Sequence, residues 1–353
     1  MDIILKKIAI HNNMKLYFLT PYPYDITYNN YMNNYFKLNN WDEFKTNKME
    51  FIYINKYNQN IHPDFNKDYI LVCDIQSIEI INYYDSYICL FKKENRIVFI
   101  YECLMHLKHQ WKIDYVKNNF SVIFQNCTDI KGENIFWIPC WNLYIDQSKY
   151  TSNIVKKKFC AVSPIFDLGL SEQLDIKRIE RIKIIKEYCE NERRIHVYGN
   201  EQWENYIPLI NFIGKLPNED NCGLYGNINL EEKIINKCKV LSNYKFILVF
   251  ESMFVNGFVT EKLIESLYTD SVVIYYGAPN IKEINNYCDL FNNGIINGHD
   301  YDVKELLHMM QTMNNTEYEN RINHVKLIRN KLNYESSSHN IKNIIMNKIR
   351  MFI

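Results

Sequence analysis

Apolar residues occur in short runs along the chain, and polar segments separate them. Two of these runs, residues 246–250 and 272–276, are rich in β-branched and aromatic side chains, which is typical of buried parallel strands. A polar loop follows the first run and leads, from Thr260 onward, into apolar positions with helical spacing. The order strand, loop, helix, strand predicts a βαβ unit in this part of the chain.

Similar patterns extend to both sides of this unit. Further runs that predict strands lie at residues 14–20, 51–54, 69–73, 87–91, 96–101, 120–124, 135–138, 158–162 and 194–198. Patterns that predict helices lie at residues 174–190, 230–241, 303–313 and 317–332. Because strands alternate with helices, the expected fold class is α/β.

Chain length and one polar segment predict two domains. The 353 residues are long for one doubly wound domain and sufficient for two. The polar stretch 141–158 is expected to link a first domain, 1–150, to a second domain, 151–335. The tail 336–353 is expected to be a helix. Its basic residues are few, which favours packing on the first domain over lying on a membrane surface.

Composition and charge exclude several classes of protein. Forty-one basic and 41 acidic residues cancel, which argues against a general nucleic-acid binder. The ten cysteines include no CxxC pair, so a zinc site has little support and reduced thiols are expected. The N-terminal apolar stretch is too short for a signal peptide, and no run approaches the length of a membrane span. We therefore expect a cytoplasmic protein, with at most peripheral membrane contact through its C-terminal helix.

The stretch 243–281 resembles a known signature. Its segments YKFILVFES, GFVTEK and VVIYYGAPNI are similar to the donor-binding signature of the α1,3/α1,4-fucosyltransferases, glycosyltransferase family 10. Upstream, RIHVYG at 194–199, KFCAVS at 158–163 and RIVFIYE at 96–102 are similar to strands of that family, with a thinner match. The other residues before 150 show no resemblance.

The resemblance implies a GT-B fold, in which two Rossmann-like domains face each other across a cleft. This agrees with the two α/β domains that the strand pattern predicts. It also implies an inverting transferase that moves L-fucose from GDP-fucose to a hydroxyl of an acceptor glycan, of GlcNAc or glucose type. The partners expected are therefore a GDP-sugar and a glycan or glycoconjugate.

Charged residues near the predicted helix start suit a nucleotide-sugar. Lys262 and Arg181 offer positive charge to a leaving diphosphate, and Arg178 competes with Arg181 for this role. Glu261 can accept hydrogen bonds from ribose hydroxyls, whereas Glu251 is expected to face the fucose or to hold the loop. The predicted donor-binding residues are Ser163, Arg181, Tyr198, Glu251, Ser252, Phe258, Val259, Thr260, Glu261 and Lys262.

The predicted catalytic base is Glu102, which ends an apolar strand of the first domain. An inverting transfer needs one base that takes the proton of the acceptor hydroxyl. Asp74 and His106 are the substitutes. No DxD-like acidic pair follows a strand, so no metal or other cofactor is expected to be required, and help from a divalent ion stays open.

Two positions depart from the family pattern. Phe258 stands where the family usually has Tyr, and Ser252 stands where it has Asn. Both changes remove hydrogen-bonding capacity near the expected sugar. Two alternatives therefore stay open: the same scaffold with another GDP-sugar, or a catalytically silent glycan-binding protein.

Overall fold

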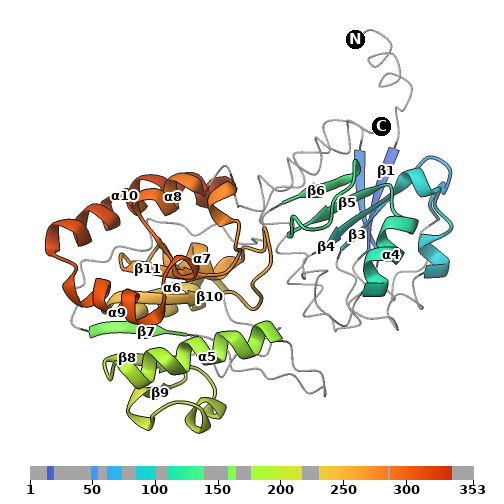
Figure 1. The fold of residues 1–353 in the computed structure, drawn as a ribbon. Helices are drawn as coiled ribbons and strands as arrows, with labels where there is room; N and C mark the ends of the chain where they lie inside the picture. The colour runs from blue at the N-terminus through green and yellow to red at the C-terminus, as the bar shows by residue number, and fades with distance from the viewer. Residues whose placement is uncertain are drawn as a thin grey trace. The chain divides into compact units, whose positions relative to one another are not determined.

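A computed structural model of the chain describes residues 14–19, 49–54, 62–73, 85–100, 110–138, 158–163, 176–216, 230–284 and 287–335. These residues fall into two compact units, one within Met1–Cys140 and the other within Trp141–Ser337 (Figure 1). Each unit is built on a six-stranded sheet. The boundary expected near residue 150 and the tail 336–353 lie outside the described residues.

The first unit contains a parallel sheet in the order β2-β1-β3-β4-β5-β6. Its elements are β1 (Met14–Leu19), β2 (Met49–Ile54), β3 (Tyr69–Cys73), β4 (Arg96–Ile100), α4 (Gln110–Asn119), β5 (Val122–Gln125) and β6 (Ile135–Trp137). The chain steps from β1 to one neighbour, β2, and then continues on the other side of β1 through β3. The order of the strands therefore reverses between β1 and β3.

One predicted strand of the first unit is wrong. Residues 85–88 are helical, and the run 87–91 contributes no strand. Within this run Ile88 and Phe91 are buried whereas Leu90 is exposed, which is a spacing of three rather than the alternation of a strand. The helix α4, which was not predicted, buries Ile113 and Val116 at the same spacing. The other predicted strands of this unit are confirmed within one or two residues.

The second unit holds a parallel sheet in the order β12-β11-β10-β7-β8-β9. Its first half comprises β7 (Lys158–Val162), α5 (Ile176–Asn191), β8 (Ile195–Tyr198), β9 (Phe212–Gly214) and α6 (Leu230–Leu241). Its second half comprises β10 (Tyr244–Phe250), α7 (Glu261–Ser266), β11 (Val272–Tyr276), α8 (Cys288–Asn293), β12 (Ile296–Asn297), α9 (Val303–Thr312) and α10 (Asn315–Glu335). All predicted helices and strands of this unit are confirmed, whereas β9, α8 and β12 were not predicted.

Helices cover both faces of the second sheet (Figure 1). Side chains of α5 and α9 join Phe246, Leu248 and Phe250 of β10 in one hydrophobic cluster. The alternate positions of β10, such as Ile247 and Val249, are equally buried and face the other way. A sheet that is buried on both faces explains why its strands read as continuous apolar runs.

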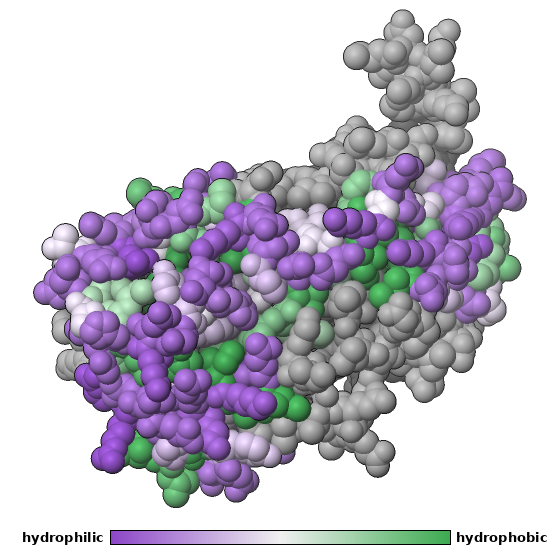
Figure 2. Space-filling view, in the orientation of Figure 1, coloured by the Kyte–Doolittle hydropathy of each residue, from purple (hydrophilic) through white to green (hydrophobic). Residues whose placement is uncertain are grey.

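The outer surface of the second unit is mostly hydrophilic over α8 and α10 (Figure 2). Within the described part of the chain, no helix combines the length and the apolar character needed to cross a membrane.

Candidate functional site

The strand order of the second sheet reverses between β7 and β10. From β7 the chain moves outward through β8 and β9, and from β10 it moves outward the other way through β11 and β12. Open α/β sheets bind ligands beside the carboxyl ends of the strands at such a reversal. Ser163 follows β7, and Glu251 with Ser252 follows β10, so three of the predicted residues lie at this point.

Glu251 is a fully buried carboxylate at the carboxyl end of β10. Its Oε1 accepts hydrogen bonds from the Thr260 amide (2.8 Å) and from the Tyr275 hydroxyl (3.3 Å), and its Oε2 accepts from Thr260 Oγ1 (2.5 Å). Burial raises the pKa of Glu251, while the nearby Lys262 ammonium and the Thr260 donors oppose that rise. Glu251 therefore holds the end of the β10–α7 loop, one of the two roles expected for it.

The loop between β10 and α7 is packed inward. Phe258 and Val259 are buried, and Gly257 has a positive φ of 78°. The Gly257 amide donates to Asn280 Oδ1 at 2.8 Å, which anchors the loop to the turn after β11. An L side chain rarely adopts such a φ, so glycine suits this position.

Thr260 caps α7 and contacts Lys262. Its Oγ1 accepts from the Lys262 amide (3.5 Å) and from Lys262 Nζ (3.2 Å). Lys262 Nζ also lies 2.9 Å from Glu261 Oε1, and the two side chains are 33% and 53% exposed. Because α7 has only six residues, its dipole is small, and the ammonium is the main positive feature here.

Neighbouring carboxylates keep Lys262 charged. Burial alone would lower the pKa of this ammonium, but Glu261 and Glu251 raise it above its usual value. Besides the Lys262–Glu261 pair, a second and less exposed ion pair joins Lys237 Nζ on α6 to Glu265 Oε2 on α7, at 2.8 Å. It connects the two helices and leaves Lys262 and Glu261 as the more accessible pair.

Arg181 is buried on α5, with 5% of its surface exposed. Because α5 connects the parallel strands β7 and β8, it runs back from the carboxyl edge, and its first turns lie at that edge. Arg181 therefore approaches the same edge as Glu251. The side chain of Arg178, its competitor, lies outside the described residues.

The remaining predicted residues divide into two groups. Tyr198 is buried, and its hydroxyl is 2.8 Å from the Tyr244 hydroxyl, which is 2.9 Å from His196 Nδ1. Its polar atom is thus engaged inside the unit, away from the Glu251 contacts. The predicted base and its two substitutes lie outside the described residues: Glu102, Asp74 and His106.

Three residues at this edge were not predicted. Tyr275 donates to Glu251, and a Cβ on Gly277 would lie 2.1 Å from the Tyr275 hydroxyl oxygen and 2.7 Å from Glu251 Cγ. His299 Nε2 is 3.2 Å from the Gly277 carbonyl oxygen, and burial lowers the pKa of His299. The available signal was weak: a tyrosine in an apolar strand, whose buried hydroxyl needs a partner, and a glycine directly after it.

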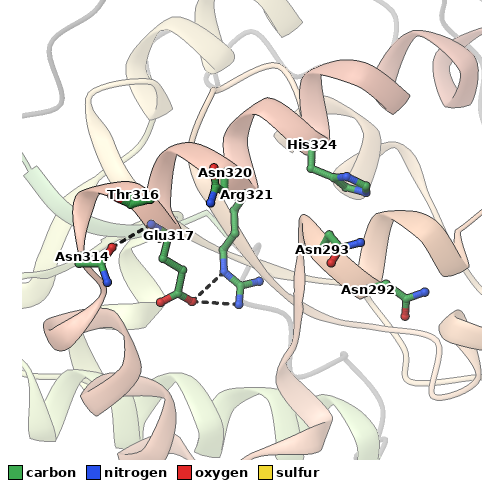
Figure 3. A pocket seen from close by; sticks show the side chains of 8 residues that line it. All are labelled: Asn292, Asn293, Asn314, Thr316, Glu317, Asn320, Arg321 and His324. Carbon is green, nitrogen blue, oxygen red and sulfur yellow. Dashed lines mark hydrogen bonds and ion pairs between the residues drawn. The ribbon is translucent and has the colours of Figure 1, made fainter.

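A surface hollow of about 730 Å³ lies elsewhere, between α8 and α10 (Figure 3). Polar side chains line it, including an ion pair between Arg321 and Glu317 at 3.1 Å. No predicted site residue lines it, so the chemistry at the carboxyl edge and this hollow are separate features. Among the described residues no group of His, Cys, Asp or Glu is arranged to hold a metal ion.

Comparison of the sequence with known proteins gives one family match and short matches to individual relatives. Residues 178–344 match the family described as Glycosyltransferase family 10 (fucosyltransferase) C-term. Alpha-(1,3)-fucosyltransferase FucT of Helicobacter pylori is 36% identical over 66 residues, which are 19% of this chain and 13% of the relative. GDP-fucose protein O-fucosyltransferase 3 of Danio rerio is 51% identical over 43 residues, which are 12% of this chain and 9% of the relative.

Comparison of structures extends over most of the chain. A crystal structure of alpha1,3-fucosyltransferase aligns with a TM-score of 0.54 and 14% identity, over 89% of this chain and 82% of that chain. A crystal structure of that enzyme with GDP gives a TM-score of 0.53. The OtsA apo structure gives 0.52 at 8% identity, over 96% of this chain and 99% of that chain. The fold is therefore of the GT-B type, as predicted.

Proposed function

Because residues 178–344 match the C-terminal model of glycosyltransferase family 10, we propose that the protein transfers L-fucose from GDP-fucose to a hydroxyl of an acceptor glycan. The observation that carries the proposal is the group Glu251, Thr260, Glu261 and Lys262, which lies where the strand order of the second sheet reverses. A charged group at such a point suits a nucleotide-sugar diphosphate.

Lys262 and Arg181 are proposed to bind the diphosphate. The Lys262 ammonium has three protons, and the contacts to Thr260 Oγ1 and Glu261 Oε1 use two of them. The third proton is available for a phosphate oxygen. As the bond from fucose to GDP breaks, negative charge grows on the leaving diphosphate, and a fixed cation stabilises that charge.

Glu261 is proposed to bind the ribose. Its carboxylate is half exposed, and its contact with Lys262 Nζ orients it without using all of its acceptor positions. Two ribose hydroxyls can donate to one carboxylate. We propose that Glu251 has the structural role in this group, since its oxygens already accept from Thr260 and Tyr275.

The transfer step is proposed to be a single displacement with inversion. The acceptor oxygen forms a bond to C1 of fucose while the bond from C1 to the GDP oxygen breaks. A carboxylate takes the proton of the acceptor hydroxyl, and GDP departs with the bonding electrons. Glu102 is the proposed base, with Asp74 and His106 as its substitutes. The two cations are proposed to suffice for the diphosphate, and turnover with and without EDTA tests whether a divalent ion contributes.

Ser252 and Phe258 favour a second candidate, the same chemistry with another GDP-sugar. Phe258 is buried and has no hydroxyl, and the half-buried Ser252 has no amide. Both changes alter the hydrogen bonds available to a sugar at this edge. The third candidate, which the same two residues leave open, is a protein that binds glycans without turnover.

A panel of GDP-sugars tests these readings. The full-length protein is incubated with each GDP-sugar and a glycan acceptor, and released GDP is measured. Turnover of GDP-fucose above the other sugars supports the proposal, and turnover of a different GDP-sugar alone replaces it by the second candidate. GDP-sugar binding without any turnover supports the third reading.

A further inference from the structure

A chain of hydrogen bonds connects the turn after β11 to Lys262. The Ala278 amide donates to the Tyr275 hydroxyl oxygen (3.4 Å), and that hydroxyl donates to Glu251 Oε1 (3.3 Å). Thr260 Oγ1 donates to Glu251 Oε2 (2.5 Å), and Lys262 Nζ donates to Thr260 Oγ1 (3.2 Å). The chain therefore crosses from β11 over the end of β10 to the start of α7.

The residues in the middle of this series of hydrogen bonds are inaccessible to water. Tyr275 and Glu251 are fully buried, and Thr260 is nearly so, whereas Lys262 is partly exposed. Gly277 leaves no space beside them, because any Cβ there would overlap Tyr275 and Glu251. Burial raises the pKa of Tyr275 well above its usual value, so its hydroxyl keeps its proton and remains a donor.

Each donor to Glu251 has a separate consequence. A carboxyl group in the core needs hydrogen-bond partners, and Glu251 has three donors among the described residues: the Thr260 amide, Thr260 Oγ1 and the Tyr275 hydroxyl. Removing the Tyr275 hydroxyl leaves Thr260 as the one described residue that donates to the carboxylate and fixes its orientation. A carboxylate that can turn no longer fixes the Thr260 hydroxyl, whose oxygen is the acceptor for Lys262 Nζ.

We propose that Tyr275 is a positioning residue, which sets the place of the Lys262 ammonium through Glu251 and Thr260. This inference rests on the proposed function, in which Lys262 binds the diphosphate of the donor. Tyr275 is fully buried, so its proposed effect on the donor is indirect. These hydrogen bonds all run within the protein, so the proposed role can be measured on the protein alone.

The test compares Tyr275→Phe with Tyr188→Phe in the full-length protein. Tyr188 Oη lies 2.9 Å from Tyr276 Oη in the same unit, is buried, and has no part in the chain to Lys262. Both variants lose one buried hydroxyl and keep the ring, so a similar loss of stability is expected from each. Only Tyr275→Phe is expected to speed hydrogen–deuterium exchange in residues 251–262 of the free protein.

Donor affinity gives the second measurement, by calorimetry with GDP-fucose. Tyr275→Phe is expected to weaken binding about ten-fold, and Tyr188→Phe is expected to leave it unchanged. Thr260→Val, which has no hydroxyl, is expected to bind GDP-fucose more weakly than Thr260→Ser, which keeps one. If Tyr275→Phe does not fold, the two Thr260 variants still test whether the hydrogen bonds from Glu251 to Lys262 affect donor binding.

The outcomes separate this inference from the proposed function. Equal exchange of residues 251–262 in Tyr275→Phe and Tyr188→Phe overturns the positioning role, as does equal affinity of Thr260→Ser and Thr260→Val. If the unmodified protein binds no GDP-sugar, the proposed function fails. The exchange comparison then still decides whether Tyr275 holds the loop.

Discussion

The two sheets of this protein have similar construction and differ in what lies at the reversal of their strand order. In the part of the chain that the structure describes, each sheet has six parallel strands. In the second sheet the reversal between β7 and β10 adjoins the charged group of Glu251, Glu261 and Lys262. In the first sheet it falls between β1 and β3, and the residues that follow those strands lie outside the described ones. A parallel sheet supplies a place for a ligand, and the residues after its strands supply the chemistry.

Under the proposed function, the second unit binds the donor and the first unit removes the proton. The largest test of this division is Glu102→Gln, which is expected to lower transfer by about a hundred-fold or more and to leave GDP-fucose binding unchanged. Turnover and calorimetry on the same preparation measure both. Asp74→Asn and His106→Gln are the matched variants. If either of them abolishes transfer while Glu102→Gln retains it, the base is that residue instead.

Lys262→Ala tests the second unit. The loss of one cation that faces a diphosphate is expected to weaken GDP-fucose binding about a hundred-fold. Titration calorimetry measures the effect, and Lys183→Ala, which removes an exposed lysine of α5, serves as the control. Equal affinity of Lys262→Ala and Lys183→Ala would exclude the phosphate role.

Gly277→Ala in the second unit and Gly132→Ala in the first compare how tightly the two units are packed at these glycines. The new Cβ at position 277 would overlap Tyr275 and Glu251, so the free energy of unfolding is expected to fall by about 2 kcal/mol. In the first unit, Gly132→Ala meets the flexible end of Ile135 at 3.0 Å and is expected to cost much less. Urea unfolding measures both. A smaller loss for Gly277→Ala than for Gly132→Ala would show that the carboxyl edge is not packed as described.

The smallest effect concerns acid stability of the second unit. Hydrogen bonds from Arg194 lower the pKa of Glu192 to about 2, and Gln311 of α9 also donates to it. A lowered pKa stabilises the folded state above the pKa of the unfolded chain, and that contribution is lost as the pH falls from about 4.5 to 2. Urea unfolding is measured at pH 6 and at pH 3. At pH 6, Glu192→Gln is expected to be about 1 kcal/mol less stable than the unmodified protein; the loss is small because the partner Arg194 is well exposed to solvent. At pH 3 the difference between the two proteins is expected to be smaller. A difference that does not shrink in acid would contradict this account.

The sequence predicted the second unit better than the first for a physical reason. The charged residues Glu251, Glu261 and Lys262 come after a continuous apolar strand, so their position at the carboxyl edge could be inferred from local pattern alone. Tyr275 could not be singled out among 28 tyrosines, because its partner Glu251 follows a different strand, β10. Tyr198 was predicted to bind the donor by resemblance, and the contact of its hydroxyl with Tyr244 was not foreseen. Local pattern does not contain such contacts between strands.

Short elements were the other source of error. β9 has three residues and β12 has two, which is too few for an alternating pattern to appear. Each is held by pairing with a neighbouring strand rather than by its own sequence. The run 87–91 was misread because an apolar segment of that length fits a turn of helix as well as a strand.

Hydrogen–deuterium exchange of the full-length protein with and without GDP-fucose tests the central claim most directly. We predict that the donor protects residues 251–262 and the first turns of α5 around Arg181, because these segments are proposed to bind the nucleotide and its diphosphate. Protection confined to other segments, such as those lining the hollow between α8 and α10, or no protection at all, would contradict the account.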